Sequence, residues 1–380
     1  MTKTILCITN DFGPRAGGIE SFVIGLIERM PHGSVTVFTS SQAGSPAFDA
    51  AWKANFGVNV IRDKSKVLLP TPRVARAVSK VSREIGATSA FFGAAAPLAL
   101  LAPAIRRAGV ERIVALTHGH EVWWAKVPPF KCAIRLMGRY TDHLTYLGNF
   151  TKSAISRSLS PAATSRMVRI APGIDTDHFS PQESASQLRA ELGLSEKDVI
   201  VSVGRLVHRK GQDFLIKALP EILKQRPSAH LLFVGEGPYR SHLEKLVEER
   251  NLQEHVTFIG RVQFADLPRY ICVGDVFAMP SRSRMAGLEV EGLGIVYLEA
   301  SSCGIPVVGG LSGGAPDAVL EGETGFAVDG TSEAEIALAV VKILSDRNLA
   351  QYMGERGRSW AIEQWRWEIW SKEFNSLLGL

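Results

Sequence analysis

Short runs of β-branched and aromatic residues alternate with helix-like patterns along the whole chain, and this alternation restricts the fold more than any other feature. Apolar strands separated by helices are typical of parallel sheets that are covered by helices on both faces. We therefore predict an α/β protein with two Rossmann-like, doubly wound parallel-sheet domains. The strands are expected in two sets, at 4–10, 35–39, 58–61, 90–93, 112–117, 143–147 and 168–171, and at 199–204, 230–235, 255–260, 275–280, 305–308 and 325–328.

The domain organisation follows from the length and from one proline-bracketed segment. A chain of 380 residues suits two hydrophobic cores better than one. The segment 172–181 begins and ends with proline, so we place the joint there. Residues 359–380 form a tryptophan-rich helical pattern that we expect to pack back on the first domain. We predict an N-terminal domain of 1–172 plus about 363–380, and a C-terminal domain of 173–362.

The overall composition limits the class of protein. With 46% hydrophobic and 21% charged residues, the chain is expected to be globular, and no apolar run is long enough to span a membrane. The start of the chain lacks the pattern of a signal peptide, and the four cysteines are scattered, so we expect a cytoplasmic protein without disulfides or zinc. A net charge of +5 comes with no nucleic-acid-binding motif, which disfavours a nucleic-acid partner.

The segment 281–314 carries the strongest functional pattern. Glu291 and Glu299 stand eight residues apart, Gly292 and Gly294 follow the first of them, and a helix-like stretch begins at Ile295. A glycine-containing turn that leads into a helix favours an anion, because the first amides of a helix lack internal partners. Such a helix would place the two glutamates two turns apart along one edge. The pattern suits a nucleotide sugar, and the alternative is a solvated pair of acids on a surface helix.

The loops after the strands of the first half contain glycines and histidines. Gly17 and Gly18 open a helix and would let a phosphate or a sugar approach the backbone, although a plain tight turn is the alternative. No G-x-G-x-x-G pattern is present there, so NAD binding and a dehydrogenase are poorly supported. His118 and His120 follow the strand at 112–117, and we predict that His118 hydrogen-bonds a sugar hydroxyl or a developing charge. A metal site is disfavoured, because the H-E-x-x-H spacing is missing.

Charged loops also follow the strands of the second half. Arg205 can grip a phosphate with its planar fork and Lys210 can add a point charge, whereas we interpret Arg209 as a solvated charge. The two cations would neutralise a departing diphosphate. Two further strand ends could shape a nucleoside pocket, at Gly235 and at Arg261 with Val262. The D-x-D pattern at 175–177 lies on the linker, and we interpret it as turn chemistry and not as a metal site.

Two basic stretches raise the question of a membrane surface. In 72–85, apolar residues fall at helical core spacing and basic residues gather on another face; the latter are Arg73, Arg76, Lys80 and Arg83. Such a face can bind anionic lipid headgroups, and a merely solvated face is the alternative. Trp123 and Trp124, followed by basic residues, suit a bilayer interface or the edge of a core. Together the two stretches slightly favour a membrane-surface enzyme.

The chain resembles a known family of enzymes over nearly its whole length. The spacing from Glu291 to Glu299 is similar to the E-x7-E signature of the retaining glycosyltransferases of family 4. Three further segments resemble motifs of that family in the same order, namely 172–175 with Phe179, 204–206 with 210–211, and 234–238. This resemblance implies the GT-B fold, in which two Rossmann-like domains face each other across a cleft.

A closer resemblance is to the phosphatidylinositol mannosyltransferases of actinobacteria, on residues 9–12, 92–98, 117–121 and 287–300. It implies a GDP-mannose donor, a phosphatidylinositol monomannoside acceptor, transfer of the second mannose at the inner face of the plasma membrane, and no metal cofactor. By this resemblance Arg205 and Lys210 hold the diphosphate, Glu299 binds the ribose, and Glu291 and His118 contact the mannose. The remaining implied positions are Asp11 and His118 for the acceptor, and Gly17, Gly18, Gly235, Arg261, Val262, Gly294, Ile295 and Val296 for the donor.

One departure and several rival functions remain. Residues 282–290 separate Ser281 from Glu291, an insertion that most of the broad family lacks, and its tip at 284–286 contains less glycine than expected. This affects the acceptor more than the donor. The alternatives are a glycosyltransferase of the same fold that uses a UDP-sugar or another lipid or small-molecule acceptor, and a non-catalytic nucleotide-sugar sensor. The retained charges at Arg205, Lys210, Glu291 and Glu299 argue against the sensor.

Overall fold

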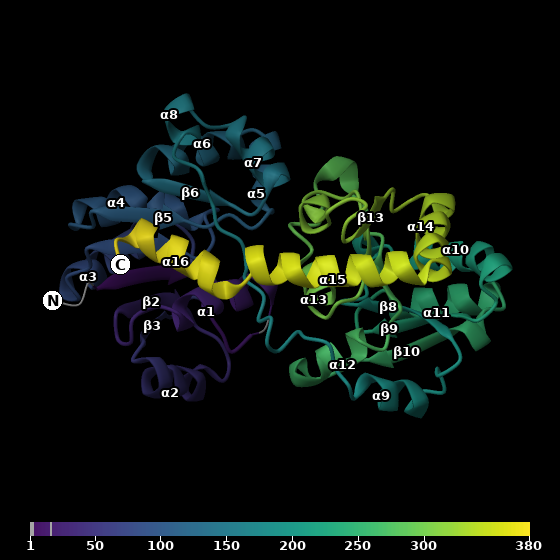
Figure 1. The fold of residues 1–380 in the computed structure, drawn as a ribbon. Helices are drawn as coiled ribbons and strands as arrows, with labels where there is room; N and C mark the ends of the chain where they lie inside the picture. The colour runs from purple at the N-terminus through teal and green to yellow at the C-terminus, as the bar shows by residue number, and fades with distance from the viewer. Residues whose placement is uncertain (1–3, 16) are drawn as a thin grey trace. The chain divides into compact units, whose positions relative to one another are not determined.

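The computed structural model describes residues 4–15 and 17–380 and divides into two compact units (Figure 1). The first unit comprises the chain up to Gly173 together with Trp367–Leu380, and the second comprises Ile174–Arg366. The chain therefore passes between the units at Gly173–Ile174 and again at Arg366–Trp367. The sequence placed these joints at 172–173 and at about 362–363.

The first unit is built on a parallel sheet of seven strands in the order β3-β2-β1-β4-β5-β6-β7. Three neighbouring strands, β2, β1 and β4, are buried along their whole length, as expected for a parallel sheet with helices on both faces. The strands are β1 (Ile5–Thr9), β2 (Val35–Ser40), β3 (Asn59–Asp63), β4 (Ser89–Phe92), β5 (Arg112–Ala115), β6 (His143–Tyr146) and β7 (Val168–Arg169).

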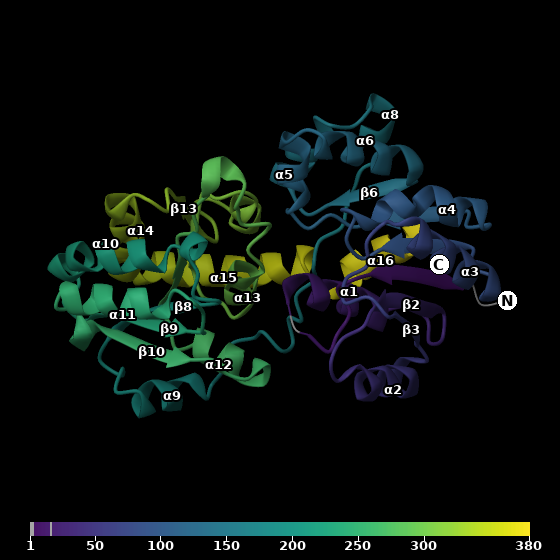
Figure 2. The ribbon, with the colours of Figure 1, turned by 180° about the vertical axis from the view of Figure 1, so that it is seen from behind.

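Helices cover both faces of this sheet. One face is covered by α3, α4 and α6, whose apolar residues share one core cluster with β1, β4 and β5. On the other face α16 contacts α1, β4 and β5 (Figures 1 and 2). The helices of the unit are α1 (Gly18–Glu28), α2 (Ser45–Phe56), α3 (Pro72–Glu84), η1 (Leu98–Leu101), α4 (Ala102–Arg107), α5 (Glu121–Lys126), α6 (Phe130–Tyr140), α7 (Asn149–Ser156), α8 (Pro161–Thr164) and α16 (Trp367–Leu378).

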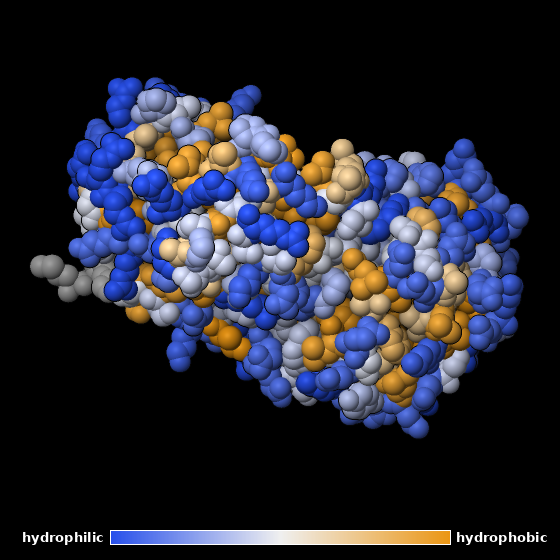
Figure 3. Space-filling view, turned by 90° about the horizontal axis from the view of Figure 1, so that it is seen from above, coloured by the Kyte–Doolittle hydropathy of each residue, from blue (hydrophilic) through white to orange (hydrophobic). Residues whose placement is uncertain are grey.

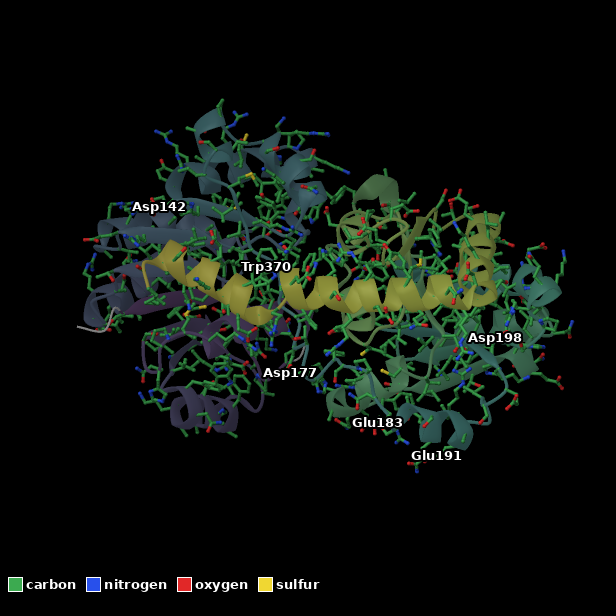
Figure 4. All side chains as sticks on the ribbon, viewed as in Figure 1. Asp142, Asp177, Glu183, Glu191, Asp198 and Trp370 are labelled. Atoms are coloured by element: carbon green, nitrogen blue, oxygen red, sulfur yellow. The ribbon has the colours of Figure 1, made fainter. Side chains whose placement is uncertain are left out.

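The predicted C-terminal helix is divided between the two units. Helix α15 (Arg347–Gln364) belongs to the second unit, and α16 begins after a break and belongs to the first. In α16 the ring of Trp367 lies under the guanidinium of Arg29 at 4.7 Å, and Phe374 contacts Phe91 edge-on at 5.2 Å. Trp370, labelled in Figure 4, lies on the same helix. The predicted packing on the first domain is therefore confirmed for α16, whereas Trp360 and Trp365 belong to the second unit.

The second unit contains a parallel sheet of six strands in the order β10-β9-β8-β11-β12-β13. The strands are β8 (Asp198–Val203), β9 (Ala229–Val234), β10 (Val256–Gly260), β11 (Val276–Met279), β12 (Val307–Gly310) and β13 (Gly325–Val328). The helices are α9 (Ala185–Glu191), η2 (His208–Lys210), α10 (Gln212–Gln225), α11 (Arg240–Glu249), η3 (Gln253–His255), η4 (Phe264–Asp266), α12 (Leu267–Ile271), η5 (Met285–Gly287), α13 (Ile295–Ser302), η6 (Ala315–Ala318), α14 (Glu333–Ser345) and α15.

Each predicted strand overlaps an observed one, and the predicted α/β class with two parallel-sheet units is confirmed. The clearest offset is at β12, which begins two residues later than predicted. The amide of Ile305 donates to the carbonyl of Ala300 at 3.0 Å and Gly304 has a φ of +77°, so Ile305 still belongs to the end of α13. Within the described ranges, none of the helices combines the length and apolar character needed to cross a bilayer.

Candidate active site

The predicted donor residues gather at one edge of the second unit. The carboxyl ends of parallel strands lie at the same edge of a sheet, and ligands of open α/β sheets bind there. The loops that follow β8, β9, β10, β11 and β12 all begin at this edge. They carry the predicted residues Arg205, Lys210, Gly235, Arg261, Val262 and Glu291.

An ion pair between Lys210 and Glu291 forms the centre of this edge. The Lys210 Nζ lies 2.9 Å from Glu291 Oε2, and each side chain is only 10% exposed. The Arg209 Nε lies 3.8 Å from the same oxygen. Burial opposes ionisation of Glu291, yet the two cations hold the pKa of its carboxyl below the usual value. Glu291 is therefore a buried, ionised acceptor, and the interpretation of Arg209 as a merely solvated charge was wrong.

The two glutamates do not share a helix. Helix α13 begins at Ile295 after Gly294, which has a φ of +78°, so Glu299 lies on the helix and Glu291 on the preceding loop. The backbone of Glu291 is held by a second loop: its amide donates to Ser312 Oγ at 3.2 Å, and its carbonyl accepts from the amide of Gly314 at 2.9 Å. The predicted spacing of two helical turns was therefore wrong, because the left-handed residue Gly294 starts the helix after the first acid.

Glycines let these loops approach each other closely. A Cβ on Gly313, where φ is +57°, would lie 2.3 Å from the carbonyl oxygen of Glu291. A Cβ on Gly211, where φ is +77°, would lie 1.9 Å from the carbonyl oxygen of Pro280. Real side chains do not tolerate such distances, so these positions require glycine. Gly211 directly follows Lys210 and so fixes the place of its loop against the end of β11.

The helix that carries Glu299 is tied to the end of β11. The hydroxyl of Tyr297 donates to the carbonyl of Met279 at 2.7 Å and lies 2.9 Å from Ser281 Oγ. Tyr297 is fully buried, and burial raises the pKa of its phenol well above the usual value, so it remains neutral. These bonds place the start of α13, with the predicted amides of Gly294, Ile295 and Val296, beside the loop of Glu291.

Glu299 is half-buried and differs electrostatically from Glu291. Burial raises the pKa of its carboxyl to about 7, although the charge of Lys210 acts in the opposite direction. The protonated carboxyl can donate one hydrogen bond as well as accept others. Near neutral pH the site therefore holds one carboxylate, Glu291, and one acid that titrates, Glu299.

A pH dependence of stability follows for Glu299. The folded pKa of about 7 lies above the ordinary value of 4.5, so the folded state binds the proton more tightly. The stability that this proton contributes is complete below pH 4.5 and is lost as the pH rises toward 7. Relative to Glu299→Gln, wild type is expected to lose on the order of 2 kcal/mol across this window. Urea unfolding of both proteins from pH 4.5 to 8 measures it, with exposed Glu363→Gln as the control; parallel curves for wild type and Glu299→Gln would refute the assignment.

A second buried ion pair supports the edge and was missed by the sequence analysis. Arg282 and Asp213 form a two-pronged pair in which Arg282 Nη2 lies 2.9 Å from Asp213 Oδ2, and the hydroxyl of Tyr239 donates to the same carboxylate at 3.2 Å. The amide of Arg282 also donates to the carbonyl of Arg209 at 2.8 Å. The insertion after Ser281 is thus anchored to the loop that carries Lys210. Its charged residues were visible in the sequence, but their partners lie far away along the chain.

The remaining predicted donor residues are more accessible. The side chains of Arg205 and Arg261 are exposed, and among the described residues neither forms an ion pair. Val262 is half-buried beside Arg261. Gly235 has a φ of +139°, and a Cβ there would lie 2.1 Å from the carbonyl oxygen of Gly204, so the ends of β8 and β9 touch through their backbones. Arg205 is therefore an uncompensated cation at the edge where a diphosphate is expected.

In the first unit, His118 lies just beyond the carboxyl end of β5. Its Nε2 contacts the carbonyl oxygen of Gly93, so Nε2 carries the proton and Nδ1 is the nitrogen that can accept a hydrogen bond. The fully buried Glu121 accepts from the amide of His118 at 2.9 Å and lies 3.2 Å from His120 Nε2. Burial lowers the pKa of His118, although Glu121 opposes this. The ring is therefore a neutral acceptor at pH 7.

Asp11 and the start of α1 form a charged cluster in the same unit. Arg15 Nε donates to Glu20 Oε1 at 2.6 Å, and Arg15 Nη2 lies 3.3 Å from Asp11 Oδ1. Burial, and then the neighbouring Glu20, raise the pKa of Asp11 above its usual value. A Cβ on Gly17 would lie 2.3 Å from Glu20 Oε2, whereas Gly18 faces open space. A carboxylate thus already lies at this helix start, so a phosphate at the predicted site would meet Glu20.

The predicted membrane residues lie on one helix, but two of them lie close to carboxylates. Arg73, Arg76, Lys80 and Arg83 are exposed on α3. Arg73 Nη1 pairs with Asp63 Oδ2 at 2.7 Å, and these hydrogen bonds hold the pKa of Asp63 well below its usual range. Arg73 therefore stabilises the turn before the helix. Arg76 and Arg83 keep uncompensated charges, whereas Lys80 lies 3.6 Å from Glu84.

The aromatic stretch at Trp123 forms the edge of a core. Trp123 and Trp124 are half-buried and both contact Phe130, at 4.9 and 4.8 Å between ring centroids. Trp124 also packs against the main core of the unit. The two indoles therefore bind α5 to α6, and the core-edge alternative describes them better than a bilayer interface does.

The D-x-D pattern serves as a turn. Asp175 Oδ1 accepts from the amides of Asp177 at 3.2 Å and His178 at 3.0 Å, while the Asp177 side chain, labelled in Figure 4, is 90% exposed. This arrangement agrees with the predicted turn. Across residues 4–15 and 17–380, no group of three or more His, Cys, Asp or Glu side chains is arranged to hold a metal ion.

Solved structures share this fold. A crystal structure of Anabaena HepE in complex with UDP superimposes with a TM-score of 0.83 at 20% identity, over 99% of each chain. The sucrose-phosphate synthase of Thermosynechococcus elongatus gives a TM-score of 0.77 at 22% identity, over 99% of this chain and 98% of that one. Residues 184–360 match the family model "Glycosyl transferases group 1". The fold and this match define a glycosyltransferase of the GT-B class.

The sequence relatives are closer and extend over the whole chain. The chain is 43% identical over 377 residues to the GDP-mannose-dependent alpha-(1-6)-phosphatidylinositol monomannoside mannosyltransferase of Mycolicibacterium smegmatis. This alignment covers 99% of this chain and 98% of that protein. It is 45% identical to the enzyme of the same name from Mycobacterium tuberculosis, over 96% of this chain and 95% of that one. The chain belongs to the same family of glycosyltransferases as these mannosyltransferases.

Proposed function

We propose that this protein is a retaining α-mannosyltransferase that moves mannose from GDP-mannose to a phosphatidylinositol monomannoside, giving the dimannoside. The observation that carries the proposal is the 43% sequence identity, over 99% of the chain, to an enzyme named for this reaction. The geometry of the second unit supports it, because a buried carboxylate and two cations lie together where a sugar diphosphate is expected.

Different residues of the second unit are proposed to bind different parts of the donor. Arg205 and Lys210 hold the diphosphate, assisted by the first amides of α13, and Glu299 binds the ribose. Glu291 accepts hydrogen bonds from mannose hydroxyls, a role that suits a carboxylate kept ionised by Lys210. Arg261 and Val262 lie at the strand end nearest the base.

The reaction needs no covalent nucleophile from the chain. The acceptor hydroxyl attacks the anomeric carbon on the face that the nucleotide leaves. The new carbon–oxygen bond forms as the bond to the β-phosphate oxygen breaks, and that phosphate takes the hydroxyl proton. Arg205 and Lys210 stabilise the charge that develops on the diphosphate. We propose that no metal ion is required, because the two cations supply this charge.

His118 of the first unit is proposed to accept a hydrogen bond from a substrate hydroxyl through Nδ1, with Asp11 contributing to acceptor binding. His118→Ala is expected to lower kcat by about 100-fold and leave GDP affinity unchanged, because Arg205, Lys210 and Glu299, which are proposed to hold the diphosphate and the ribose, lie in the other unit. Initial rates and calorimetric GDP binding measure the two effects. Phe22, whose ring contacts that of His118, gives a control in Phe22→Leu, which keeps the imidazole. A His118→Ala protein with normal kcat would exclude the imidazole from the site.

The enzyme is proposed to work at the inner face of the plasma membrane as a peripheral protein. The acceptor in the names of the relatives is a phosphatidylinositol lipid, which is a component of membranes. The exposed cations Arg76 and Arg83 on α3 provide an attraction to anionic lipid of about 1 kcal/mol each.

The direct test is mannosyl transfer by the purified protein. GDP-mannose and UDP-glucose are incubated separately with phosphatidylinositol monomannoside, with and without EDTA, and the lipid product is identified by mass spectrometry. Product from GDP-mannose alone, undiminished by EDTA, is expected. Product from UDP-glucose would refute GDP-mannose as the specific donor, and sensitivity to EDTA would refute the metal-independent mechanism. GDP binding without any turnover would favour the sensor alternative.

The acyl state of the acceptor is a second variable of the same assay. The relative from Corynebacterium glutamicum, 38% identical over 99% of this chain, is named for a monoacylated phosphatidylinositol monomannoside. The assay therefore includes the acceptor with and without the additional acyl chain. A preference of tenfold or more in kcat/KM assigns the acceptor.

A further inference from the structure

A pocket of about 490 Å³ in the first unit is lined largely by arginines. It lies between the C-terminal ends of α4 and α6, beside the turn that leads into β6. Its charged and aromatic lining residues are Arg106, Arg107, Arg139, Arg166, Asp142 and Tyr140. Asp142 is labelled in Figure 4. Among the lining residues, all in the described part of the chain, Asp142 is the single carboxylate.

Two of the arginines, Arg107 and Arg166, are held by backbone carbonyls, which leave their charges in place. Arg166 donates from Nη2 to the carbonyl of Gly138 at 3.0 Å, and Arg107 donates from Nε to the carbonyl of Pro103 at 3.1 Å. Carbonyl oxygens hold a guanidinium in position but leave its positive charge. Asp142 compensates Arg106, whose Nη2 lies 2.7 Å from Asp142 Oδ2. The pocket therefore presents a surplus of positive charge on guanidinium groups, whose planar forks match phosphate oxygens.

The pocket lies at the opposite edge of the first unit's sheet from His118. Asp142 directly precedes β6 and Arg107 ends the helix before β5, so both mark the amino ends of parallel strands. His118 follows the carboxyl end of β5. An anion bound among the arginines therefore lies at the other end of these strands from His118, the residue proposed to contact a substrate hydroxyl.

The surface around the pocket is both basic and apolar. On α6, Leu136 and Tyr140 are 44% and 39% exposed, and Arg135 and Arg139 point outward beside them. Figure 3 looks onto the side of this unit that carries α6 and shows strongly hydrophilic residues with hydrophobic ones between them. Exposed apolar residues flanked by arginines suit a bilayer interface, where the guanidinium reaches the headgroups and the apolar part enters the lipid.

This surface continues into the predicted membrane helix. Helix α4 packs beside α3, where Ser79 Oγ donates to the carbonyl of Ala104 at 3.2 Å, and α4 also contacts α6. The three helices cover one face of the sheet, and Glu84 is the only carboxylate in their sequences. One face of the unit thus carries a basic surface from α3 through α4 to α6.

We propose that the arginine pocket binds the phosphate of an anionic phospholipid in a bilayer, with Leu136 and Tyr140 entering the interface. This lipid is a docking lipid and not the acceptor. The inference deepens the proposed membrane attachment, which it moves from α3 alone to the face formed by α3, α4 and α6. A free phosphoanion would use the arginines equally well, but it would not account for the exposed leucine and tyrosine.

Vesicle binding by the full-length protein tests the proposal. Sedimentation is measured with vesicles of phosphatidylcholine alone and with vesicles that also contain phosphatidylglycerol. The double variant Arg107→Gln/Arg139→Gln is expected to bind the anionic vesicles at least about tenfold more weakly than wild type. Lys224→Gln/Lys245→Gln removes the same charge from exposed helices of the second unit, and it is expected to bind like wild type. Leu136→Asp keeps every arginine and is expected to weaken binding as well.

The outcomes separate this proposal from the proposed function. Vesicle binding needs no turnover, and both charge variants are expected to transfer mannose normally to an acceptor dispersed in detergent. If the two double variants lost vesicle binding equally, the effect would come from net charge alone, and the proposed binding of lipid in the pocket would be refuted. Glycerol 3-phosphate is the soluble probe. If it stabilised the protein against heat through Arg107 and Arg139, and the protein showed no preference for anionic vesicles, the ligand of the pocket would be a soluble phosphoanion and the proposed lipid would be refuted.

Discussion

Replacing Lys210 with alanine is expected to reduce turnover about 1000-fold and to destabilise the second unit at the same time. The loss of one charge that stabilises a developing anion reduces turnover by about 100- to 1000-fold. The same change leaves Glu291 buried with only the more distant Arg209 beside it. Removing one partner of a buried ion pair destabilises by about 3 kcal/mol. Initial rates with GDP-mannose and urea unfolding at pH 7 measure the two effects.

A double variant separates the two effects of this change. Lys210→Met with Glu291→Gln removes both charges from the buried pair, so much of the lost stability is expected to return. Activity is not expected to return, because the cation at the diphosphate and the carboxylate at the sugar are both missing. A Lys210→Ala protein of normal stability would show that Glu291 does not depend on Lys210. Restored turnover in the double variant would exclude both residues from the chemistry.

Replacing Arg205 with alanine is expected to reduce kcat/KM by at least about 100-fold while stability stays unchanged. Its side chain is exposed and among the described residues it forms no ion pair, so the fold has little to lose. Steady-state rates and a thermal unfolding curve are the measurements. Arg205→Lys keeps the charge without the two-pronged geometry, and an intermediate rate is expected. The exposed Lys245→Ala is the matched control, and near-normal turnover of Arg205→Ala would remove this residue from the diphosphate site.

The contrast between Arg205 and Lys210 could not be predicted from the sequence. Both follow β8 and both are basic, so the sequence assigned them the same role. Their difference arises because Glu291, far along the chain, packs against Lys210 and not against Arg205. For the same reason Arg209 was assigned to solvent. A local pattern gives the type of side chain, but burial and ion pairing depend on contacts between distant loops.

The fold was more accessible to prediction than the site. Most strands of these parallel sheets are short apolar runs between helical patterns, so the approximate positions of β1 to β13 could be predicted from the order of residues along the chain. The start of α13 could not, because it depends on the left-handed conformation of Gly294, and one turn of difference moves Glu291 off the helix. The pattern on α3 predicted its exposed basic face, but not that Arg73 pairs with Asp63.

The place of α16 has a consequence for how the chain is made. The helix covers Phe91, and the carbonyl of Leu378 near its end accepts a hydrogen bond from Ser89 Oγ at 2.8 Å, so the sheet of the first unit needs residues that follow the entire second unit in the chain. Between Gly173 and Trp367 the ribosome makes the entire second unit, which at about 5–20 residues per second takes on the order of 10–40 s. During that time the apolar face of β4 lacks its cover. The first unit to emerge is therefore completed only after the second unit has been made.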